Sequence, residues 1–168
     1  MAFKQATVNA SRVPSTQTNF PSYVDLSRLG VSTLAEAQSV RVYSDSAKTT
    51  ELAREIVSAT EMHVKIPSLT STFVIYVDYD GVRADYAVTD TYGRNAVWSD
   101  YRAVYHLNDL VDSTGNGYTL TNNNTVTLNA GGLLGGAADF TSGNTNKSLS
   151  VASTLSISTT NYTYDMWL

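Results

Sequence analysis

The sequence predicts an all-β protein, an antiparallel β-sandwich with one short helix. Short apolar runs rich in valine, isoleucine, tyrosine and threonine recur along the chain, and turn-forming residues separate them. Helical patterns are scarce, because only one segment joins an N-cap residue to good helix formers. The 168 residues suffice for one domain, or for one domain of about 100 residues and part of a neighbour.

Six strands are expected in the first half of the chain. They lie near residues 5–12, 20–27, 39–43, 52–58, 61–66 and 72–79. The clearest is the last, where Ile75, Val77 and Tyr79 share one face and the turn-forming pair at 80–81 closes the strand.

The strand at 61–66 alternates apolar and polar side chains, so we expect one buried face and one solvent-facing face. Pro67 is expected to end this strand, because proline cannot donate to a sheet ladder. The short helix is expected at residues 32–38, with Ser32 as its N-cap.

The chain is expected to contain a first domain at residues 1–98 and part of a second at 99–168. Residues 81–102 form either a linker or a short connecting helix and strand, and the boundary falls near 95–102. After it, asparagine, threonine, glycine and serine dominate, and glycine pairs between short apolar runs predict tight turns. The final segment, 162–168, has the pattern of a strand with no downstream partner, which predicts an incomplete second domain.

Composition argues against several classes of protein. The net charge is −4, the eleven lysines and arginines form no run, and a nucleic-acid partner is therefore not expected. With no cysteine, a disulfide framework and thiolate chemistry are excluded. The amino terminus lacks the pattern of a cleaved leader and no apolar run reaches 18 residues, so neither a leader nor a membrane span is expected.

Five segments of the first domain together resemble an uncharacterised family of bacterial and phage domains of unknown function. They read FPSYVDL at 20–26, SVRVY at 39–43, ELAREI at 51–56, VKIPSL at 64–69 and IYVDYDG at 75–81. The resemblance spans about residues 5–100. It implies an architecture and a context, but it carries no functional residue over to this chain.

The junction after this domain is similar to one that leads into a concanavalin-A-like jelly roll of the laminin-G type. AVW at 96–98 is followed by AVYHLND at 103–109, DSTGNG at 112–117, GGAADF at 135–140 and YTYDMWL at 162–168. This resemblance implies that residues 99–168 are the first part of a lectin-like domain.

Two groups of side chains are candidate sites. Asp109, Asp112 and Asn116 supply oxygen ligands of the kind that calcium prefers, although their spacing departs from an EF-hand loop. The alternative for these residues is an Asx-capped turn ahead of a strand. Calcium is the one cofactor considered.

Aromatic side chains near the domain junction are candidates for stacking against sugars. The exposed candidates are Tyr92, Trp98, Tyr101, Tyr105 and Tyr118. The alternative, favoured for Trp98 and Tyr105, is that these rings fill the sandwich cores or an interdomain contact. The two histidines, His63 and His106, are interpreted as structural or surface residues, and no nucleophile elbow, phosphate-binding loop or zinc-protease motif is present.

Together these features favour a structural and adhesion protein of a virus particle, not an enzyme. A phage tail, a fibre or a capsid decoration would each fit, located on the virion surface or outside the cell. Its expected partners are a glycan or host-surface receptor, other virion proteins, and further copies of itself. The alternatives are a bacterial cell-surface or exported carbohydrate-binding protein, and the non-catalytic part of a polysaccharide hydrolase.

Overall fold

The structure, a computed structural model, describes residues 2–7, 13–132, 135–141, 143 and 146–152. Within these ranges strands far outnumber helices and the strands pair antiparallel, so the predicted all-β class is confirmed. The chain divides into two compact units. Unit 1 comprises residues 1–100 and 113–115, and unit 2 comprises residues 101–112 and 116–168.

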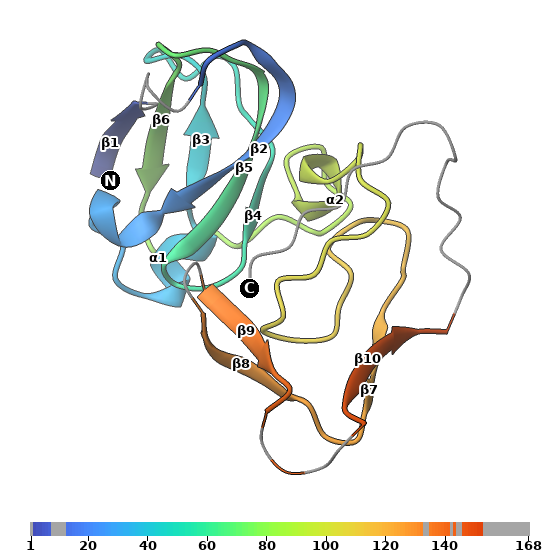
Figure 1. Cartoon of the computed structure of the whole chain (residues 1–168). Coiled ribbons are helices and arrows are strands. Elements are labelled where there is room, and N and C mark those ends of the chain that lie inside the picture. Colours follow the sequence, from blue (N-terminus) through green and yellow to red (C-terminus); the bar gives the residue numbers. More distant parts are fainter. Residues whose placement is uncertain (1, 8–12, 133–134, 142, 144–145, 153–168) are drawn as a thin grey trace. The chain divides into compact units, whose positions relative to one another are not determined.

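Unit 1 contains two three-stranded antiparallel sheets (Figure 1). The first has the order β1 (Ala2–Thr7), β6 (Val74–Tyr79) and β3 (Arg41–Tyr43), and the second has the order β2 (Gln17–Asp25), β5 (Glu61–Leu69) and β4 (Arg54–Ile56). A 3₁₀ helix at Leu26–Leu29 and the helices α1 (Leu34–Gln38) and α2 (Arg94–Val97) complete the unit. No helix in the described residues has the length and apolar character needed to cross a membrane.

The core of unit 1 draws on both sheets. From β6 it takes Ile75, Val77 and Tyr79, and from β5 it takes Met62, Val64, Ile66 and Leu69. Apart from Leu69, which lies three residues after Ile66, these residues alternate along each strand, so the faces predicted from the sequence are correct. The opposite face of β5 is polar as expected, but Glu61 on it is buried and only 6% exposed.

Strand β5 does not end at Pro67, and that prediction was wrong. The strand continues to Leu69 and pairs with β2 on both sides of the proline. The position that faces Pro67 in this register is Asn19, which has a φ of 50° and is absent from the regular pairs. The missing N–H of the proline therefore falls at an irregular point of the ladder, where its cost is small.

Helix α1 begins one residue later than predicted. Its N-cap is Thr33, whose hydroxyl accepts a hydrogen bond from the amide of Glu36, while the Glu36 carboxylate accepts from the amide of Thr33. Ser32 lies outside this capping box and donates to the same carboxylate through both its amide and its hydroxyl. The pattern identified the helix correctly, but a serine and a threonine in succession left its start ambiguous.

The other element boundaries shift by a few residues. The first strand starts earlier than expected, at Ala2, and residues 8–12 of the prediction lie outside the described part of the chain. Residues 26–27 belong to the 3₁₀ helix instead of the preceding strand. In the connection at 81–102, the short helix left open as an alternative is present as α2.

Unit 2 contains two antiparallel strand pairs in its described residues. Strand β7 (Leu120–Asn123) pairs with β10 (Ser148–Val151), and β8 (Thr127–Gly132) pairs with β9 (Gly135–Asp139). The two predicted glycine pairs end β8 and begin β9, where Gly132 faces Gly135. A Cβ added to Gly132 would lie 2.9 Å from the carbonyl oxygen of Gly135, so close strand approach requires glycine there. The strand expected at 162–168 lies outside the described residues.

Candidate functional site

The structure places the predicted site residues in both units. Tyr92 and Trp98 belong to unit 1, whereas Tyr101, Tyr105, Asp109, Asp112, Asn116 and Tyr118 belong to unit 2. The six in unit 2 lie on two segments, residues 101–112 and 116–118, which we together call the tyrosine loop. The aromatic and oxygen-ligand candidates, considered separately in the sequence, thus share one local structure.

Asp112 joins the two ends of the tyrosine loop. Its side chain is buried, and its Oδ1 and Oδ2 atoms accept hydrogen bonds from the amides of Val104 and Tyr118, each at 3.0 Å. Charge-assisted hydrogen bonds from backbone amides to a buried carboxylate are among the stronger hydrogen bonds in proteins. Asp112 therefore fixes the separation of the two chain segments that carry the loop's aromatic residues.

Two further side chains brace the loop. The Asn116 amide nitrogen donates to the carbonyl oxygens of Tyr101 and Arg102, at 3.2 and 3.1 Å. The Tyr105 hydroxyl donates to the carbonyl oxygen of Tyr118 at 2.5 Å. Burial raises the pKa of Tyr105, and the negative charge of Asp112 raises it further, so the phenol stays protonated as the donor.

An arginine and a tyrosine side chain meet on this braced loop. The Arg102 guanidinium carbon lies 4.7 Å from the centre of the Tyr118 ring, and Arg102 also donates a hydrogen bond to the Tyr118 hydroxyl. Arg102 is exposed and Tyr118 partly so, while the neighbouring Tyr101 is 40% exposed. Tyr101 and Tyr118 offer aromatic rings that carry hydroxyl groups, and Arg102 offers a guanidinium with further hydrogen-bond donors.

Three carboxylate oxygens of the predicted calcium ligands accept hydrogen bonds from backbone amides of the loop. Asp109 Oδ1 accepts from the amide of Val111 at 2.8 Å, which is an Asx turn, and both Asp112 oxygens face backbone amides. Positively polarised N–H groups aimed at these carboxylates favour the structural alternative over a cation. Calcium at Asp109, Asp112 and Asn116 stays a prediction, and the donor set does not favour it.

Trp98 is buried, at 6% exposed, and the expectation that its ring is exposed was wrong. Its indole N–H donates to Glu55 Oε2 at 2.5 Å, and the Ser113 hydroxyl donates to Glu55 Oε1 at 2.7 Å. Both oxygens of a buried carboxylate are thus satisfied within unit 1. The favoured alternative for Trp98, an aromatic plug, agrees with this environment.

The burial of Glu55 could not be predicted from the sequence. It lies in the expected strand at 52–58, next to an isoleucine, and the alternation of polar and apolar residues in a strand predicts that such a glutamate faces solvent. Its donors lie 43 and 58 residues further along the chain, so no local pattern connects the three. A buried acid of this kind is found only when the fold is known.

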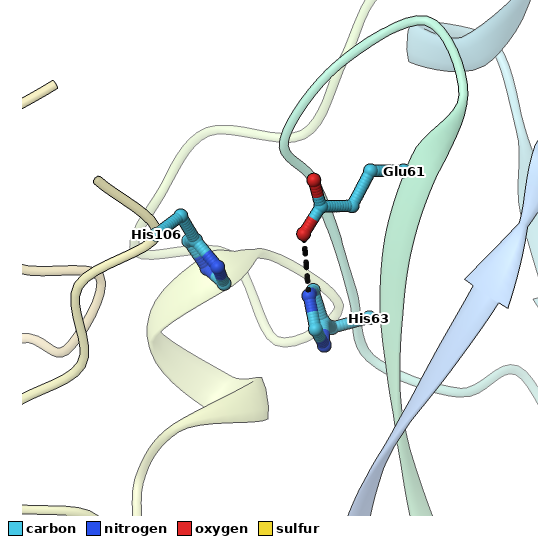
Figure 2. A group of neighbouring side chains, drawn as sticks. All are labelled: Glu61, His63 and His106. Atoms are coloured by element: carbon cyan, nitrogen blue, oxygen red, sulfur yellow. Dashed lines mark hydrogen bonds and ion pairs between the residues drawn. The ribbon is translucent and has the colours of Figure 1, made fainter. Parts of the chain in front are cut away.

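Next to Glu55 on the sheet, His63 forms a carboxylate–imidazole pair with Glu61 (Figure 2). The His63 Nε2 and Glu61 Oε1 atoms lie 3.1 Å apart, and the imidazole centre is 5.2 Å from a Trp98 ring centre. Such a pair fixes the orientation of the imidazole. Tyr23 meets the same imidazole edge-on, at 5.9 Å between ring centres, so His63 is packed between aromatic rings.

Tyr92 lies half-buried in unit 1, with its ring tilted against that of Tyr86. Its carbonyl oxygen accepts a hydrogen bond from the amide of Arg54 at 3.0 Å. The residue thus ties the segment before α2 to strand β4. Its role in ligand binding stays a prediction.

Comparison of this chain with protein-family models, with curated proteins and with solved structures found no match. The two resemblances drawn from the sequence therefore stay predictions, and the site must be judged on its own geometry.

Proposed function

We propose that this chain is a non-enzymatic structural and adhesion protein of a virus particle, such as a tail, fibre or capsid-decoration protein. Unit 1 acts as a rigid mount, and unit 2, as the opening part of a lectin-like domain, binds a glycan or a protein. The observation that carries the binding role is the pair formed by the exposed Arg102 and the partly exposed Tyr118 on the hydrogen-bonded tyrosine loop.

The pair suits sugar binding because it offers both kinds of contact that a pyranose needs. The apolar face of a sugar packs on an aromatic ring, and its hydroxyls accept hydrogen bonds from a guanidinium. The bonds from Asp112 and Asn116 fix the backbone of the loop before any ligand arrives. Preorganisation of this kind lowers the entropy lost on binding.

The mounting role is supported by the way unit 1 uses its buried charges. Arg54 is 1% exposed and pairs with Asp85, while Asp78 is 2% exposed and pairs with both Lys48 and Arg83. These side chains connect strands to distant loops and hold them in one arrangement. Charges held by opposite charges in this way favour a stiff frame over a reactive centre.

A glycan array tests the binding role with the whole chain and two variants. We expect Arg102→Ala and Tyr118→Ala each to weaken binding about tenfold, which corresponds to about 1.4 kcal/mol. Tyr118 supplies its backbone amide and carbonyl to the loop, so truncating its side chain leaves both of those hydrogen bonds in place. Tyr118→Phe keeps the ring and should retain most of the affinity.

Matched substitutions in unit 1 serve as controls. Arg28 has a side chain that is 86% exposed and Tyr23 is 41% exposed, so Arg28→Ala and Tyr23→Ala remove the same chemistry from another surface. They should leave glycan binding unchanged. Equal losses in all four alanine variants, or no glycan bound by the chain, would refute the assignment to the tyrosine loop.

The setting on a particle needs an independent test. Antibodies raised against this chain should label virus particles from the source organism in electron micrographs. Labelling of the cell envelope alone would instead support the bacterial surface protein. Cleavage of a polysaccharide by the full gene product, abolished by substitution of one carboxylate, would overturn the non-enzymatic proposal.

A further inference from the structure

The two sheets of unit 1 have four edge strands, and two of these are very short. Strands β3 and β4 contain three residues each. Each lies at one edge of its sheet (Figure 1). A short edge presents too few free backbone groups to pair stably with another strand. These two edges are therefore protected by their length.

The third edge strand, β2, is long but interrupted. Pro21 lies in it and has no N–H to donate, and Asn19 has a φ of 50° that breaks the regular ladder. Proline and local irregularity are the features by which natural sheets block edge-to-edge pairing. Strand β2 is thus a poor template for another strand.

The fourth edge strand, β1, has none of these protections. All six of its residues pair in unbroken register with β6, and its sequence AFKQAT contains no proline and only one charge, Lys4. Among the described residues, no strand pairs with its other edge. It carries a row of backbone donors and acceptors suited to adding another strand.

We infer that β1 pairs antiparallel with β1 of a second copy of this chain, about a two-fold axis at Gln5. The free edge of β1 presents its backbone groups at every second residue, so the two-fold axis of a self-pairing strand must pass through a residue. An axis at Lys4 or at Gln5 pairs five residues of each copy, and an axis at any other residue of β1 pairs fewer. An axis at Lys4 would set the two Lys4 ammonium groups opposite each other, which is unfavourable.

An axis at Gln5 avoids this repulsion. It places Gln5 opposite Gln5 of the second copy, where the two amides can hydrogen-bond, and Lys4 opposite Ala6. Phe3 then faces Thr7 of the second copy. The β1-β6-β3 sheet of one copy joins the same sheet of the other to form one continuous sheet of six strands. Because the two-fold axis uses β1 of both copies, the assembly closes as a dimer and does not grow into a fibre.

Light scattering coupled to size-exclusion chromatography measures the predicted mass. The chain has a mass of 18.2 kDa, so a dimer should scatter as about 36 kDa, twice that value. A particle of 18.2 kDa at all attainable concentrations would overturn the inference. Glycan binding by the tyrosine loop does not depend on this result.

Disulfide trapping identifies the strand and the register. The native chain has no cysteine, so Gln5→Cys introduces a single thiol at the predicted axis. Opposed residues of an antiparallel pair lie about 4.5–5.5 Å apart at Cα, within the range of a disulfide. Mild oxidation should cross-link Gln5→Cys far more than Thr18→Cys on the exposed edge of β2, and equal cross-linking would refute the register.

Charge variants at the same position provide a complementary test. Gln5→Lys and Gln5→Glu each place like charges opposite each other across the axis and should both elute as monomers with native circular dichroism. An equimolar mixture should recover a dimer at low salt, because each pair then brings opposite charges together. Dimers of either variant alone, or a mixture that stays monomeric, would contradict the axis at Gln5.

Discussion

Arg54 should be one of the main polar determinants of the stability of unit 1. Its side chain is 1% exposed; Nε donates to the carbonyl oxygen of Val40 at 3.0 Å, and Nη2 donates to that of Gln38 at 2.8 Å. The third donor, Nη1, pairs with Asp85. Burial lowers the pKa of Arg54, but the hydrogen bond to Asp85 opposes this, and an arginine stays charged at neutral pH.

The substitution Arg54→Met keeps the apolar stem of the side chain and removes only the guanidinium. The Gln38 carbonyl then loses its closest partner, which costs about 1–3 kcal/mol for a buried acceptor. Loss of the hydrogen bond to the Val40 carbonyl lowers the free energy of unfolding by only about 1 kcal/mol, because Arg41 still donates to that oxygen at 2.8 Å. Asp85 is 36% exposed and regains water, so its share is at most about 1 kcal/mol. The expected total is about 3 kcal/mol.

Urea unfolding measures this loss, with Trp98 fluorescence as the reporter of unit 1. The measurement is made in a Trp167→Phe background, so that a single tryptophan emits. Arg28→Met is the matched control, because the Arg28 side chain is 86% exposed and should cost less than about 0.5 kcal/mol. If the two variants lose the same stability, the reasoning from buried acceptors is wrong.

Three further predictions concern single positions. Burial acts to raise the pKa of Asp78, but hydrogen bonds from two cationic side chains outweigh it and lower the pKa. The ionised Asp78 should therefore stabilise the folded state above about pH 4, and this contribution should vanish as the pH falls further. Asp78→Asn should therefore flatten the acid limb of the stability curve measured by urea unfolding. Asp112→Ala should cost about 2–4 kcal/mol and speed hydrogen exchange at the two amides it accepts from, equally with calcium or with a chelator. Gly30→Ala should lower the melting temperature more than Gly81→Ala, because both have positive φ, but only at Gly30 would a Cβ crowd the Tyr79 hydroxyl, at 3.2 Å.

The strands of unit 1 could be predicted because their pattern is local. Ile75 and Val77 lie two residues apart in a run rich in β-branched and aromatic residues, and that spacing places them on one face of β6. The continuation of β5 past Pro67 could not be predicted, because it depends on an irregular residue in β2, 48 positions earlier in the chain. The start of α1 was ambiguous for a local reason, since two adjacent residues can both cap a helix.

The candidate site divides in the same way. The sequence identified Tyr101, Tyr118 and Asp112 as functional candidates from their residue types and their position after the domain junction. It did not identify Arg102 as the partner of Tyr118, because that contact joins positions 16 residues apart across a loop without periodicity. For Trp98 it favoured a buried ring over an exposed one, but it could not identify the carboxylate that holds the indole, which comes from β4.

What the sequence alone determined is the all-β class and the buried face of the main strands, because each follows from the spacing of apolar residues along one segment. Only the tertiary structure decided which carboxylates are buried, which side chains hydrogen-bond within the tyrosine loop, and which edge strand has no partner among the described residues. These properties depend on contacts between residues that are far apart in the chain. Such contacts leave no local pattern in the sequence from which they could be predicted.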